Sequence, residues 1–237
     1  MKVVFDKEIL EYNPKRTYAL IQSRVLNSVA RREQVEPRSF SRTIFSIGKA
    51  YNNKNNSNSM TDDSIKFAFE LFKMGEYNLT GIIYSFLIKF NENNPQKAEE
   101  LARKALNVAK KRKDPIHIMA RAYDLSQIYR NQCYGSQKHI NALCEVKDNL
   151  KYIIQNYQKA KKRFNTITKE VRPLNNYEFM LCSIRMEIAK ATKNTNPERA
   201  EHELLEAYKI MIKYGDGTLT QRILSLLNQI HFKHQKL

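Results

Sequence analysis

The sequence is poor in the residues that build tight turns and has no tryptophan: its 237 residues include only six glycines and six prolines. Glycine and proline supply the backbone conformations of most hairpin turns, so a protein of many short strands is disfavoured. An all-α protein is the expected class. The hydrophobic share of 42% is enough for a sizeable core in one large domain or two small ones.

Long apolar runs are missing as well, so no segment is expected to span a membrane. The N-terminal stretch MKVVFDKEILEYN carries acids where a signal peptide would have its apolar centre, and the chain is therefore expected to be cytoplasmic. Cys133, Cys144 and Cys182 lie too far apart for a disulfide framework or a metal-binding doublet, and we expect buried free thiols.

Motifs of catalysis and cofactor binding are also missing. The sequence has no glycine-rich phosphate loop, no nucleophile elbow and no pair of histidines around a glutamate. The five histidines are scattered, which predicts surface residues rather than zinc ligands. We therefore expect a protein that is not an enzyme and has no catalytic residues, no metal and no cofactor.

The clearest positive feature is a repeated helix design. Residues 94–114, NPQKAEELARKALNVAKKRKD, and residues 196–216, NPERAEHELLEAYKIMIKYGD, align at an offset of 102 positions, which is three times 34. In both, an Asn-Pro pair can begin a helix. Ala98, Ala102 and Ala105 then fall on one stripe, where small side chains let a second helix approach closely.

Two further segments strengthen the pattern. Gly75-Glu76-Tyr77 forms a glycine, acid and aromatic turn, and Ala122, Leu125, Ser126 and Tyr129 follow the spacing of a repeat's first helix. With its 34-residue period, the chain resembles the tetratricopeptide repeat (TPR) family. This resemblance implies stacked antiparallel helical hairpins, a TPR-like α-solenoid, here with an N-terminal helical extension.

We expect three parts along the chain. Residues 1–51 form an N-terminal helical segment, residues 52–61 an Asn- and Ser-rich linker, and residues 62–237 the helical repeat domain. The first two helices are predicted from Pro14 to about Arg32 and from Ser39 to Tyr51. In the repeat domain, the first helix is expected from Ile65 after a cap at Asp62, and a long helix is expected from about Gln137 to Lys162. The number of hairpins within residues 134–172 stays open.

The net charge of +17 lies mainly in residues 1–60, which carry +6, and 95–173, which carry +11. Such a balance favours anionic partners, although a merely solvated surface explains it equally well. Two basic runs stand near expected helix C-termini, where cations also offset the helix dipole. If both runs share an edge, they predict nucleic-acid contacts by Lys110, Lys111, Arg112, Lys161, Lys162 and Arg163.

Residues 27–44 resemble a helix-turn-helix of DNA-binding regulators. The resemblance implies that Arg38, Ser39 and Arg42 face the major groove and its phosphates. Gln34 departs from the motif, because it stands where glycine is usual.

Two functions follow. The first is a non-enzymatic scaffold or adaptor whose basic concave groove binds a peptide or an acidic protein segment. The TPR resemblance implies that the first helix of each hairpin lines this groove. The alternative is a DNA-binding regulator with a peptide-sensing or dimerising repeat domain, and self-association is open in both. The candidate groove residues are Tyr123, Gln127, Arg130, Asn131 and Arg185.

Overall fold

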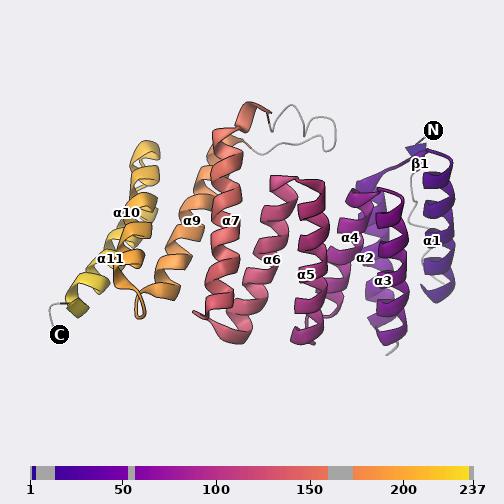
Figure 1. Ribbon diagram of the computed structural model, residues 1–237, viewed down its shortest axis with the longest axis horizontal. Helices are drawn as coiled ribbons and strands as arrows, with labels where there is room; N and C mark the ends of the chain where they lie inside the picture. The colour runs from indigo at the N-terminus through magenta and orange to yellow at the C-terminus, as the bar shows by residue number, and fades with distance from the viewer. Residues whose placement is uncertain (1, 4–13, 53–56, 160–172, 235–237) are drawn as a thin grey trace. The chain divides into compact units, whose positions relative to one another are not determined.

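A computed structural model describes residues 2–3, 14–52, 57–159 and 173–234. It confirms the all-α class, with neighbouring helices packed in pairs (Figure 1). The chain forms two compact units, residues 1–112 and residues 113–237.

Unit 1 contains five helices and one very short pair of strands in its described residues. The strands β1 (Lys2–Val3) and β2 (Gln34–Val35) pair in parallel, with Val3 opposite Val35. The helices are α1 (Pro14–Ala30), α2 (Pro37–Asn52), α3 (Ser57–Lys73), α4 (Tyr77–Phe90) and α5 (Pro95–Arg112).

Aromatic and branched aliphatic side chains fill the core of unit 1. Phe40 of α2 meets Phe67 of α3 edge to face, with ring centres 6.2 Å apart. Phe86 of α4 lies so close to α2 that a Cβ atom on Gly48 would overlap its ring. The N-terminal helices α1 and α2 therefore share one core with α3 and α4.

Helix α3 begins earlier than the sequence suggested. Its first residue is Ser57, whereas a cap at Asp62 was expected, so the second half of the expected linker is helical. The physical reason is burial: Met60 and Thr61 are covered by the core, which stabilises an additional turn despite the polar composition of the segment.

The two repeated helices form as expected. Asn94 caps α5 by accepting the N–H of Lys97 at 3.2 Å, and Asn196 caps its counterpart by accepting the N–H of Arg199 at 3.0 Å. In both helices, the small residues predicted for close approach are buried, namely Ala98, Ala102, Ala105, Ala200 and Ala207.

Unit 2 consists, in its described residues, of α6 (Pro115–Cys133), α7 (Gln137–Gln155), α9 (Leu174–Thr192), α10 (Pro197–Tyr214) and α11 (Gly217–His234). Helix α7 packs between α6 and α9, and α10 packs against both α9 and α11. One continuous helix to Lys162 was expected, but α7 ends at Gln155; residues 157–159 are helical again, and Lys162 lies outside the described residues. Asn156 terminates α7, and its side-chain amide donates to the carbonyl of Tyr152 at 3.0 Å.

Candidate partner-binding face

One face of unit 2 is hollowed between α9 and α11. A cavity of about 670 Å³ lies against Lys193, at the end of α9, and against the α11 residues Gln221, Leu224 and Asn228. A smaller cavity of about 320 Å³ lies between Met186 of α9 and Leu226 of α11. Ser225 lines both cavities, so they adjoin, and we call them together the α9–α11 groove.

The side chains of the groove combine positive charge, amides and apolar surface. Lys190, Lys193 and Arg222 supply the charge, and no carboxylate lines either cavity among the described residues. Gln221 and Asn228 offer amide donors and acceptors that match a peptide backbone. Leu224 is an exposed hydrophobic side chain. The groove thus has the chemistry to hold an extended segment that carries both acidic and apolar side chains.

Helix α6 carries the other predicted groove residues, none of which lines the two cavities. Tyr123, Arg130 and Asn131 are exposed and Gln127 is half-buried. Residues 123, 127, 130 and 131 follow helical spacing, so they lie on one side of α6. The guanidinium of Arg130 reaches the carboxylate of Glu187 on α9 at 3.7 Å, which connects α6 to the helix that lines the groove.

Arg185 was predicted to line a partner groove, but its side chain is buried between helices. Its side chain is 4% exposed and pairs with Glu203 of α10. Glu203 is 2% exposed and also pairs with Lys147 of α7. Arg185 therefore lies in a buried ion cluster between three helices, and its guanidinium is not available at the surface.

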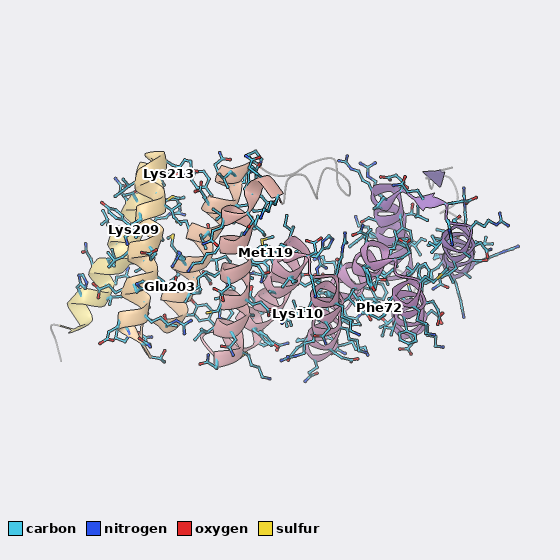
Figure 2. The ribbon with its side chains drawn as sticks, turned by 45° about the horizontal axis from the view of Figure 1, so that its top comes forward. Phe72, Lys110, Met119, Glu203, Lys209 and Lys213 are labelled. Carbon is cyan, nitrogen blue, oxygen red and sulfur yellow. The ribbon has the colours of Figure 1, made fainter. Side chains whose placement is uncertain are left out.

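The outer part of this cluster reaches solvent. Glu206 accepts from Lys209 at 2.6 Å and lies 3.6 Å from Arg185, and Figure 2 shows Glu203 and Lys209 on the same helix. The hydrogen bond from Lys209 lowers the pKa of the Glu206 carboxyl below its ordinary value. Glu206 is thus suited to carry negative charge beside the buried guanidinium of Arg185.

His139, expected at the surface, is fully buried at the start of α7. Its Nδ1 accepts the N–H of Gly135 at 3.2 Å, and that glycine has a left-handed backbone with φ of +76°. Burial lowers the pKa of the imidazole, and Arg130 contributes in the same direction while Glu187 opposes it. His139 is therefore a neutral structural residue of the α6–α7 turn.

The cysteines are free thiols, as expected. Cys182 is fully buried, and burial raises the pKa of its thiol to about 11. Cys133 and Cys144 are half-buried, and the guanidinium of Arg199 donates to the Cys144 sulfur at 2.8 Å. Across the described ranges of the chain, no three acidic, histidine or cysteine side chains gather as metal ligands would.

The proposed DNA-reading residues lie at the start of α2. Arg38 and Arg42 are exposed, but the Ser39 hydroxyl donates to the carbonyl of Glu36 at 3.2 Å and so belongs to the helix start. Six residues, 31–36, separate α1 from α2, whereas a helix-turn-helix uses three or four. The left-handed residue is Arg32, with φ of +59°, and not Gln34.

The structure describes only the first of the two basic runs. Lys110 and Lys111 are exposed at the end of α5, and Arg112 donates to the side chain of Asn78 on α4. Lys161, Lys162 and Arg163 lie outside the described residues, so a shared basic edge stays a prediction.

Sequence reasoning missed the cations of the α9–α11 groove. Lys190 and Lys193 do carry a signal, because their spacing of three places them on one side of α9. Arg222 carried no comparable signal, since only the packing of α11 beside α9 brings it to the same groove.

None of the described helices is both long and apolar enough to cross a membrane. No protein-family model matches the chain, and no curated relative matches it. Among solved structures, the crystal structure of BtubC (BKLC) from P. vanneervenii is similar over 96% of this chain and 94% of that chain. The identity is 11% and the TM-score 0.42, which is too low to define a family.

Proposed function

We propose that the chain is a non-enzymatic, TPR-like scaffold or adaptor that binds an acidic protein segment on the α6, α9 and α11 face of unit 2. The α9–α11 groove is the centre of this site. The exposed residues of α6 form its margin.

The observation that carries the proposal is the charge of the groove. Lys190, Lys193 and Arg222 converge on two adjoining cavities from two different helices, and no described carboxylate lines them. Cations that share a concave surface attract an anionic partner and speed its association. Because the same surface contains leucine and amide side chains, a peptide with alternating acidic and apolar residues fits better than a simple polyanion.

The finer architecture belongs to the same proposal. In this arrangement, α6 and α7 form one hairpin, and α9 and α10 form the next. Helix α11 would be the first helix of a third hairpin. Packing of each first helix on the next would give a solenoid whose inner side is this face. The paired helices and the repeated alanines of α5 and α10 support this arrangement.

A binding experiment tests the function. A fluorescent dodecapeptide of repeating Asp-Glu-Leu units is titrated with the full chain, and anisotropy reports binding. We expect binding that weakens with salt and that is lost for the peptide of repeating Asn-Gln-Leu units. The double variant K190E/R222E should reduce the affinity at least about tenfold, since two attractive contacts become repulsive.

The matched control is R38E/R42E, which changes the net charge equally on exposed residues of unit 1. This control should bind the peptide like the parent. Equal losses in the two double variants would show that overall charge, and not the groove, attracts the peptide, and would contradict the proposal.

The alternative, a DNA-binding regulator, finds no specific support in the connection between α1 and α2. Its test is the selection experiment on Arg38 and Arg42 given in the Discussion.

A further inference from the structure

A second surface with distinct chemistry lies in unit 1, where the end of α5 meets the turn between α3 and α4. Two lysine ammonium groups lie over phenylalanine rings there, and Figure 2 labels Phe72 of α3 and Lys110 of α5 in this region. We call it the aromatic corner, and it consists of Phe69, Phe72, Lys73, Tyr77, Lys110 and Lys111.

One aromatic side chain of the corner is largely exposed, whereas Phe72 and Tyr77 are half-buried. Phe69 is 52% exposed, although phenylalanine is normally a core residue. Phe69, Phe72 and Lys73 are at helical spacing of three and four on α3, so their side chains lie together. The ring of Tyr77 meets that of Phe72 edge to face, with ring centres 5.4 Å apart.

Cations lie directly over these rings. The ammonium of Lys73 is 4.4 Å from the centre of the Phe69 ring, and that of Lys111, on α5, is 4.9 Å from the centre of the Phe72 ring. Arg112 hydrogen-bonds to Asn78 of α4 and so fixes the end of α5 beside the turn. Lys110, next in the chain to Lys111, is exposed. Cations from two helices are thus concentrated around the aromatic surface.

Two carboxylates flank the corner. Glu70 is exposed and pairs with Lys73 at 3.0 Å, and Glu76 is half-buried at the start of α4. Glu70 offsets Lys73, so the positive charge available to a ligand comes mainly from α5.

We propose that the aromatic corner binds single-stranded nucleic acid. Phosphates contact Lys110 and Lys111, and an unpaired base stacks on Phe69. Single strands combine phosphate charge with exposed base faces, and proteins bind them with cations and aromatic rings in alternation. In a duplex the bases are stacked inside, so exposed phenylalanine would gain nothing there. This site is separate from the peptide groove and does not depend on it.

The test uses the full chain and a fluorescent oligothymidine strand, with anisotropy as the readout. We expect the logarithm of the association constant to fall linearly with the logarithm of the salt concentration. The slope should be about −0.7 for each phosphate neutralised. The variant K110E/K111E should lose binding by more than roughly tenfold and should flatten the slope, since two phosphate contacts are removed.

The aromatic contribution is tested separately with Phe69. Because one stacked base contributes substantially, F69A should weaken binding by roughly fivefold to a hundredfold, and F69W should restore it. Phe69 is half-exposed, so neither change is expected to unfold unit 1, and melting curves of the variants verify this.

The matched control is K15E/K49E, which makes the same change of charge at exposed residues of α1 and α2. It should retain most of the parent's affinity for the strand. Three results would overturn the inference: no binding by the parent at low salt, an equal loss in K15E/K49E and K110E/K111E, or duplex DNA bound as tightly as the single strand. The last would indicate charge alone, without stacking.

Discussion

Helices α5 and α10 begin with the same cap and bury alanine at two equivalent pairs of positions, Ala98 with Ala200 and Ala105 with Ala207. They differ at other buried positions, and the change in chemistry is largest at one of them. Leu101 of α5 is fully buried in the apolar core of unit 1. Its equivalent in α10, 102 residues later, is Glu203, which is 2% exposed and pairs with Arg185 and Lys147. One helix design can therefore serve an apolar core or a buried ion cluster.

The difference shows what the repeat requires. Close approach requires small residues at the two shared alanine positions, whereas at a third position Ala102 of α5 corresponds to the buried Leu204 of α10. The position of Leu101 and Glu203 can be apolar or charged, provided that the neighbouring helices supply the matching side chains. Leu101 has an apolar core around it, and Glu203 has the guanidinium of Arg185 and the ammonium of Lys147. Buried charges are tolerated only when paired, so the second solution constrains three helices at once.

The largest effect is expected when Glu203 of α10 is replaced by the residue that α5 has at the equivalent position. Replacing Glu203 by leucine copies the apolar residue of unit 1 into unit 2. It removes the carboxylate that Arg185 and Lys147 share and leaves Arg185 with only the more distant Glu206, at 3.6 Å, which should cost about 3–5 kcal/mol of unfolding free energy. Urea unfolding followed by circular dichroism measures it. The double change R185M/E203L should recover part of the loss, because an apolar pair can replace a buried ion pair, whereas Lys147 still lacks the carboxylate of Glu203. Equal stability of E203L and the parent would contradict a buried ion cluster.

The next effect tests whether the shared alanines are equivalent. A98L and A200L should each overpack a helix contact and cost about 1–3 kcal/mol. Thermal melting gives the loss for each variant. A19L is the control, since Ala19 is exposed on α1 and a leucine there meets no neighbouring helix. If both core variants melt like A19L, the repeated positions are not helix contacts.

A third prediction exchanges the residues that follow the C-terminal ends of α5 and α10. Lys113 and Gly215 are equivalent positions with left-handed backbones, φ of +55° and +65°. Because an L side chain costs about 1 kcal/mol in that region, K113G should stabilise the chain by about that amount and G215K should destabilise it similarly. Denaturant unfolding of the two variants should shift in opposite directions; a shift in the same direction would rule out backbone strain as the cause.

A smaller effect concerns pH and only unit 2, which contains all five histidines. The pKa of His139 is lowered by burial, so on acidification the unfolded chain binds a proton before the folded chain does. This contribution to stability is complete above the ordinary histidine pKa of about 6.5 and is lost as the pH falls below it. H139Q should reduce the dependence of the melting temperature on pH in this range. An unchanged dependence would show that another group causes it.

The smallest effect is expected on α2. R38A/R42A should change the unfolding free energy by less than about 0.5 kcal/mol, because both side chains are exposed. Selection of bound fragments from random duplex DNA then distinguishes the two functions. An enriched sequence motif that disappears in the double variant would support the regulator, while no enrichment by the parent would remove it.

The sequence predicted the repeated elements well for local reasons. Asn94 and Asn196 cap their helices, Pro197 begins α10 and Tyr214 ends it, all from contacts within a few residues. It failed at Ser57 and at Gln155. The polar segment before Asp62 forms the first turn of α3 because Met60 is buried in the core of unit 1. The end of α7 was missed because no glycine or proline stands next to Gln155.

By itself, the sequence determined the helical class, the stripes of small residues and most helix starts, because these depend on neighbours three or four positions away. Only the tertiary structure decided which charges are buried and which are available. Arg185 and Lys190 both lie on α9, but one faces Glu203 and the other lines the groove with Arg222. Helical spacing fixes the angle between two side chains of one helix, whereas the helices packed around it decide what each side chain meets.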